Sequence, residues 1–100
     1  MFHKAMNVMK DASTCKMPIK VRRVHLNGLD GCCEKKCNHF LIKINKNLPE
    51  NHAIDVLIHE IAHADAWDLV GDNIHGDKWG VCYSKLYRIW EKYLSEQENL

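Results

Sequence analysis

The sequence predicts an α+β fold in which a small antiparallel sheet packs on a histidine-bearing helix and on a C-terminal helix that follows it. Residues 40–45 alternate apolar and other side chains, as a half-buried strand does. Residues 50–67 and 77–93 instead repeat apolar side chains at helical spacing. The chain has 100 residues, which favours one domain over residues 1–100 with a thin core.

The N-terminal part, residues 1–46, holds the predicted first helix and the strands. Apolar side chains at helical spacing predict an amphipathic helix over residues 2–12: Phe2, Ala5, Met6 and Met9. Pro18 closes that segment, and Ile19–Leu26 is a predicted strand whose apolar phase shifts after the Arg22-Arg23 pair. A β-bulge at the arginines would explain the shift.

A turn separates this strand from the next. Gly28 and Gly31 can adopt positive φ, and the Asn and Asp beside them can bond their own backbone, which predicts a hairpin-like return. The segment Phe40–Asn45 is then a predicted strand with one buried face, formed by Phe40, Ile42 and Ile44. Two or three antiparallel strands are therefore expected before the long helix.

Residues 47–95 hold the two main helices. Pro49 and Glu50 predict the start of the first, because proline presets the backbone of a first turn and an acidic side chain suits a helix N-terminus. Gly71 predicts its end. Its apolar side chains lie almost all round the axis, which predicts deep burial. They are Ile54, Leu57, Ile58, Ile61, Ala62, Ala64 and Trp67.

A second amphipathic helix is predicted from Asp77, which is expected to be its N-cap. The polar tail from Ser95 is expected to fray. The apolar face of this helix should pack against the first main helix, and it comprises Trp79, Cys82, Tyr83, Leu86, Ile89, Trp90 and Tyr93.

The first main helix carries the pattern His-Glu-Ile-Ala-His at residues 59–63. His59 and His63 are one turn apart, so both imidazoles leave the same face and can bind one zinc ion. Glu60 lies one position further round the helix, close enough to act on a water without binding the metal. Burying these three side chains unpaired would be costly, and a metal removes that cost. The alternative is that ordinary core hydrogen bonds satisfy them.

Catalytic zinc usually has three protein ligands, so a third must come from elsewhere. His75 is the predicted third ligand, twelve residues beyond His63. The break expected at Gly71 lets the chain fold back, and Gly76 permits a close approach. The alternative for His75 is an exposed loop histidine, with acidic ligands in its place: Asp72, Asp77 or Glu91.

The order of these features resembles the SprT-like zinc metalloproteases, a zincin group that includes the Spartan proteases, which cut proteins crosslinked to DNA. The resemblance covers about residues 38–93. It rests on two motifs, His59-Glu60-Ile61-Ala62-His63-Ala64 and His75-Gly76-Asp77-Lys78-Trp79. The chain lacks the C-terminal zinc ribbon that many members carry, so it resembles a minimal, phage-type or mobile-element form.

The resemblance implies a zincin-like metalloprotease that hydrolyses peptide bonds, with Zn²⁺ on His59, His63 and His75 and with Glu60 as general base. DNA-associated proteins are among the substrates it implies. An extended peptide would be held by strand addition along Phe40–Asn45. Tyr83 and Tyr87 are expected to pack, with stabilisation of the oxyanion as the alternative. The competing hypothesis is a non-catalytic zincin-fold binding module for protein or DNA, whose zinc is structural.

Charge divides the chain into two halves. Residues 1–46 carry ten Lys and Arg against three Asp and Glu, a net charge of +7, whereas residues 47–100 carry four against ten, a net charge of −6. The alternative to a functional role is that the two halves simply solvate and pair with each other. As a functional surface, the basic half favours contact with DNA phosphates through Arg22, Arg23, Lys35, Lys36, Lys43 and Lys46.

The chain has five cysteines, an odd number, and the segment from residue 1 to residue 10 has no apolar signal-peptide core. Both features predict an intracellular, cytoplasmic protein with reduced thiols. No segment approaches the roughly 20 apolar residues that span a bilayer, so no membrane contact is expected. A second metal site at Cys15, Cys32, Cys33 and Cys37 is an alternative to inert thiols, although no C-x-x-C pair is present.

Overall fold

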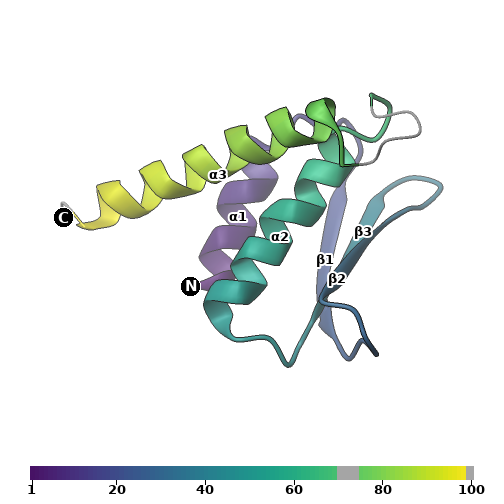
Figure 1. Ribbon diagram of the computed structural model, residues 1–100, viewed down its shortest axis with the longest axis horizontal. Coiled ribbons are helices and arrows are strands. Elements are labelled where there is room, and N and C mark those ends of the chain that lie inside the picture. The colour runs from purple at the N-terminus through teal and green to yellow at the C-terminus, as the bar shows by residue number, and fades with distance from the viewer. Residues whose placement is uncertain (70–74, 99–100) are drawn as a thin grey trace.

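Three helices lie on one side of a three-stranded sheet (Figure 1). The computed structural model describes residues 1–69 and 75–98. In chain order the elements are α1 (Phe2–Ala12), β1 (Ile19–Val24), β2 (Gly31–Lys35), β3 (Phe40–Asn45), α2 (Glu50–Asp65) and α3 (Asp77–Glu98). Helix α2 contacts β2 and β3, and both α1 and α3 pack against α2. The predicted α+β class is confirmed.

The sheet is mixed, which corrects the expectation that all its strands are antiparallel. Its order is β1-β3-β2, in which β2 is antiparallel to β3 and β1 is parallel to β3. Strand β3 takes the centre because its inner face is fully apolar: Phe40, Ile42 and Ile44 are each at most 3% exposed. A strand that is hydrogen-bonded on both edges cannot accept another, so peptide binding along Phe40–Asn45 does not fit this sheet.

The predicted bulge in β1 is absent. The strand pairs with β3 without interruption, from Ile19 opposite Phe40 to Val24 opposite Asn45. The apolar pattern shifts because Arg23 lies on the helix-facing side of the strand, at a position where strict alternation would place an apolar residue.

Arg23 joins three parts of the chain. Its guanidinium lies over the ring of Phe2 in α1, 4.7 Å from the centroid. The same group donates hydrogen bonds of 3.3 Å to the carbonyl oxygens of Asn45, Lys46 and Leu48. Arg23 therefore links the end of β3 and the segment before α2 to α1. Its charge lies on the helix-facing side of the sheet and not on the basic outer surface that the sequence predicted.

Helix α2 is buried around most of its circumference, as its almost continuous apolar sequence predicted. It approaches the sheet closely at Gly31, the first residue of β2. A Cβ atom at this glycine would lie 2.6 Å from Cγ1 of Val56 and 2.9 Å from the carbonyl oxygen of Lys43. Only a residue without a side chain lets β2 press directly on α2.

Helix α2 ends at Asp65, earlier than predicted, and Gly71 lies outside the described residues. Two tight turns end it, in which the N–H of Trp67 donates to Ala64 O and the N–H of Leu69 donates to Ala66 O. Trp67 was expected to lie within the helix. It instead follows the helix, 39% exposed, with its ring edge-on to Phe40 at 5.3 Å between centroids.

Helix α3 begins with Asp77, which is its first residue rather than its N-cap, and continues to Glu98. The segment from Ser95 to Glu98 is therefore helical, where fraying was predicted. Leu86 and Trp90 bury the face that packs on α2, as expected. Among the described residues, no helix combines the length and the apolar character needed to cross a membrane.

The position of Arg23 leads to a test of stability. Replacing Arg23→Ala removes a charged donor from three carbonyl groups and should lower the free energy of unfolding by about 1–3 kcal/mol. The matched variant Arg22→Ala alters an exposed neighbour and should change stability by no more than about 0.5 kcal/mol. Urea denaturation followed by far-UV circular dichroism measures both. Equal losses in the two variants would contradict the structural role of Arg23.

Candidate metal centre

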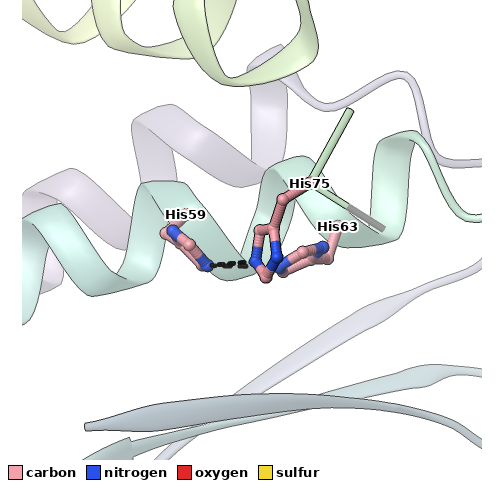
Figure 2. Close-up of side chains that lie close together, drawn as sticks. All are labelled: His59, His63 and His75. Carbon is pink, nitrogen blue, oxygen red and sulfur yellow. Dashed lines mark hydrogen bonds between the residues drawn. The ribbon is translucent and has the colours of Figure 1, made fainter. Parts of the chain in front are cut away.

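Three histidines converge at one end of α2. His59 and His63 leave the same face of the helix, and His75 reaches them from the segment that precedes α3 (Figure 2). The Nε2 atoms of His59 and His63 are 3.1 Å apart, and those of His59 and His75 are 3.4 Å apart. All three side chains offer a ligand atom within 4.8 Å of the others.

Two of the three separations, those from His59, fit a tetrahedral zinc site. With Zn–N bonds of about 2.0–2.1 Å and tetrahedral angles, two ligand nitrogens are separated by about 3.3–3.4 Å. The observed Nε2 distances of 3.1 Å and 3.4 Å lie close to that value. Three imidazole side chains whose ligand atoms lie within 4.8 Å of one another are a donor set that a divalent cation can take when their nitrogens are unprotonated.

Burial favours the neutral form of the two histidines on α2. Desolvation, followed by the proximity of His59 and His75, lowers the pKa of His63 to about 4. The pKa of His59 is also lowered, first by burial and then by His75, although the carboxylate of Asp55 acts in the opposite direction. Because only a neutral imidazole has a free lone pair for a metal, both side chains are ready to bind one at neutral pH.

Glu60 is the one buried charged residue among those described, at 7% exposed. Burial alone raises the pKa of its carboxyl to about 7. A group with that pKa both accepts and releases a proton readily near neutral pH, which is the property that a general acid–base catalyst needs. Glu60 therefore has the chemistry of a proton carrier next to the histidine cluster.

An aromatic residue of α3 backs all three histidines. The ring centroid of Trp79 lies 4.8 Å from that of His59, 5.5 Å from that of His63 and 5.2 Å from that of His75. Its Nε1 donates to the carbonyl oxygen of His59 at 3.3 Å. Trp79 thus fixes the distance between α2 and α3 where the imidazoles meet.

A second α3 residue, Tyr83, continues this contact. Its ring stacks on Trp79 with 5.0 Å between centroids, and its hydroxyl donates to Oδ1 of Asp55 at 2.8 Å. Burial, together with that bond to Asp55, raises the pKa of Tyr83 to about 12. Asp55 was missed in the sequence, although its position four residues before His59 places both on one helix face.

A cleft of about 480 Å³ opens beside the cluster. Its floor is the stripe of α2 that ends in His59 and Glu60, one wall is the turn before β2 together with Gly31, and Tyr83 closes the other side. The remaining lining residues are Gly28, Leu29, Asp30, His52, Asp55 and Val56. An elongated molecule entering this cleft would meet Glu60 and His59 together.

The other candidate ligands do not join the cluster. Among the described residues, His59, His63 and His75 form the one group of three or more metal-binding side chains, without Asp77 or Glu91. Asp72 lies outside the described residues. The five cysteines are free thiols and form no such group. Burial raises the pKa of Cys33, which faces α2, to about 12, so this thiol stays protonated.

A family model described as the SprT-like family matches residues 1–95 of the chain. The match extends over both the helices and the sheet, beyond the region around the two motifs. Neither the comparison with curated proteins nor the comparison with solved structures finds a match.

The third histidine provides the test of the metal centre. Replacing His75→Ala leaves two ligands on α2 and should weaken zinc binding by about 100-fold or more. Titration against a chromogenic chelator measures the affinity. The control is His25→Ala, which removes an exposed histidine that bonds only Asn27. Unchanged affinity in the His75 variant would show that the third ligand lies elsewhere.

Proposed function

Because the chain belongs to the SprT-like family, we propose that it is a zinc-dependent metallopeptidase that hydrolyses peptide bonds. The observation that carries the proposal is the position of Glu60, buried beside three convergent histidines at the end of an open cleft. A purely structural zinc site needs four ligands and no carboxylate poised for proton transfer.

The residues of the site would have different roles in the reaction. His59, His63 and His75 would hold the zinc, which when bound polarises a carbonyl group and makes a water molecule more acidic. The Glu60 carboxylate takes a proton from the attacking water and delivers it to the amine that leaves. The low polarity around Glu60, which raises its pKa to about 7, makes the second transfer as accessible as the first.

The free edge of β2 is the proposed binding surface for the peptide backbone. The bonds from the N–H of Asn45 to Asp30 O and from the N–H of Lys36 to His39 O fix the ladder between β2 and β3. Alternate residues of an antiparallel strand point their backbone groups in opposite directions. Those of Gly31, Cys33 and Lys35 therefore point away from β3, where no other described strand pairs with them.

An extended peptide that pairs with this edge would run along the wall of the cleft, past Gly31. The close packing of Gly31 on Val56 keeps the edge of β2 beside the floor formed by α2. The same mode of strand addition that the sequence analysis assigned to β3 is thus proposed for β2.

DNA-associated proteins are the proposed substrate class, and a cytoplasmic location with reduced thiols is part of the proposal. Arg22 and Lys43 are cross-strand neighbours on the face of the sheet that is turned away from the helices, where they would meet phosphate groups. Lys36 and Lys43 also pair with Glu34, at 3.1 Å and 3.0 Å. Together with the inward orientation of Arg23, these pairs reduce the charge that the surface offers.

The same surface favours the second candidate function, a non-catalytic module that binds protein or DNA and whose zinc is structural. Lys46 would extend the basic surface beyond Arg22, Lys36 and Lys43. Lys35 would not, because it lies opposite Phe40 on the helix-facing side of the sheet, 4.0 Å from Asp68. In this case the histidine cluster would hold α2 and α3 together, and Glu60 would have no chemical task.

Replacing Glu60→Gln tests the peptidase directly. Cleavage of a denatured protein should fall by about 100-fold or more while zinc content stays at that of the unaltered protein. Removing zinc with a chelator should abolish cleavage and leave the far-UV circular dichroism spectrum largely unchanged. The binding module would instead show no turnover in any form and would unfold when its zinc is removed.

A proline in β2 tests the proposed substrate edge. Replacing Cys33→Pro removes an N–H that points away from β3, and proline is tolerated at such edge positions, so the fold should persist. Loss of one backbone hydrogen bond to the peptide should raise KM by about 2–10-fold. The matched variant Cys32→Pro removes an N–H that points to β3 and should lower the melting temperature. An unchanged KM in the Cys33 variant would exclude this edge.

A further inference from the structure

We propose that Tyr83 is a further catalytic residue, whose hydroxyl donates a hydrogen bond to the carbonyl oxygen of the peptide bond that is cleaved. The proposal rests on the peptidase function above. It assigns to α3 a part in the chemistry that the histidine motif of α2 leaves open.

The reaction requires such a donor. When water adds to an amide carbon, the electrons of the C=O bond move onto the oxygen, and donors placed there stabilise the charge that develops. Glu60 cannot serve, because as a general base it accepts the proton of the water. His59, His63 and His75 cannot serve either, because their Nε2 atoms converge on one point as a ligand set.

The residues that line the cleft leave few choices. Apart from His59, the described lining contains two side chains with an N–H or O–H group, His52 and Tyr83. His52 lies seven residues before His59, which is about 10 Å along the helix axis, and it pairs with Asp30 at 3.2 Å. The ring of Tyr83 lies edge-on to that of His59, with 6.2 Å between ring centroids. Tyr83 is therefore the side-chain donor beside the point where Glu60 and the histidines meet.

Three contacts hold Tyr83 in place. Its ring lies between Trp79, 5.0 Å away, and Tyr87, 5.8 Å away, so the three aromatic side chains form a continuous row along α3. Its hydroxyl donates to the exposed carboxylate of Asp55 at 2.8 Å. Because Asp55 can accept hydrogen bonds from water instead, a substrate carbonyl can take over this bond. Asp55 is a positioning residue that keeps the hydroxyl in the cleft until the substrate arrives.

The hydrogen bond of Tyr83 completes a balanced sequence. Water adds to the carbonyl carbon and gives one proton to Glu60, while the carbonyl oxygen gains the electron pair and accepts the hydrogen bond. The C–N bond then breaks, its electrons pass to nitrogen, and Glu60 returns the proton to that nitrogen. Tyr83 keeps its own proton throughout. The second proton of the water stays on the new carboxyl group and is then released to solvent, so the products are a carboxylate peptide and an amine peptide.

Replacing Tyr83→Phe keeps the ring and its stacking and removes only the hydroxyl. The expected result is a fall in kcat of about 100–1,000-fold with little change in KM, because the hydrogen bond strengthens as charge develops on the oxygen. Tyr93→Phe is the matched control, since Tyr93 stacks on Trp90 further along α3 and does not line the cleft. It should retain the unaltered kcat. Equal kcat values in the two variants would overturn the proposal.

A binding measurement separates a catalytic role from a structural one. A phosphonamidate peptide reproduces the charged tetrahedral oxygen, and its affinity should fall in Tyr83→Phe by the same factor as kcat. The affinity of an uncleaved peptide, measured in the Glu60→Gln background, should not change. If both affinities fall together, Tyr83 shapes the cleft and the proposal fails. If the unaltered protein cleaves no peptide, it is the peptidase function that fails, whatever the Tyr83 variant does.

Discussion

The burial of α2 between the sheet and the other two helices is the constraint on which the rest of the structure depends. Its apolar residues face β2, β3, α1 and α3, and they leave one stripe for the polar side chains His52, Asp55, His59 and His63. Two of the three histidines and the proposed general base thereby lie on one closely packed helix. A site built on such an element keeps its geometry better than a site built on loops.

The same burial shifts the pKa values of His63 and Glu60 in opposite directions through one physical effect. Desolvation penalises the charged form of any group, so it lowers the pKa of a histidine and raises that of a carboxyl group. It leaves His63 uncharged and therefore able to bind a metal, and it brings Glu60 into the range where a proton can be exchanged. If α2 were more exposed to solvent, the pKa shifts of both groups would become smaller.

Periodicity predicted the helices and the central strand because, in those elements, the apolar positions in the sequence are the positions that become buried. The order of the strands in the sheet produces no such pattern in the sequence. The central position of β3 depends on which strand offers an inner face that is apolar throughout, and Arg23 interrupts the apolar alternation in β1. The segment Gly31–Lys35 was not predicted as a separate strand, because cysteine, glutamate and lysine show no clear alternation and its first residue has no side chain.

The sequence predicted the part of the site that is set by residue spacing and motif, but not the contact between two residues that are far apart in the chain. The convergence of His59, His63 and His75 was expected from spacing and from the glycine and tryptophan that follow the third histidine, and the structure brings the three together. The bond between Tyr83 and Asp55 joins residues 28 positions apart on two helices. Only the crossing of those helices brings them into contact, and no sequence pattern encodes that crossing.

The strand order has a consequence for the chain during its synthesis. Strand β3 is made last and takes the central place, so β1 and β2 have no hydrogen-bonding partner in the sheet until residue 45 has left the ribosome. The three strands therefore cannot be added to the sheet in the order of the sequence, because the strand made last is the one on which both others pair.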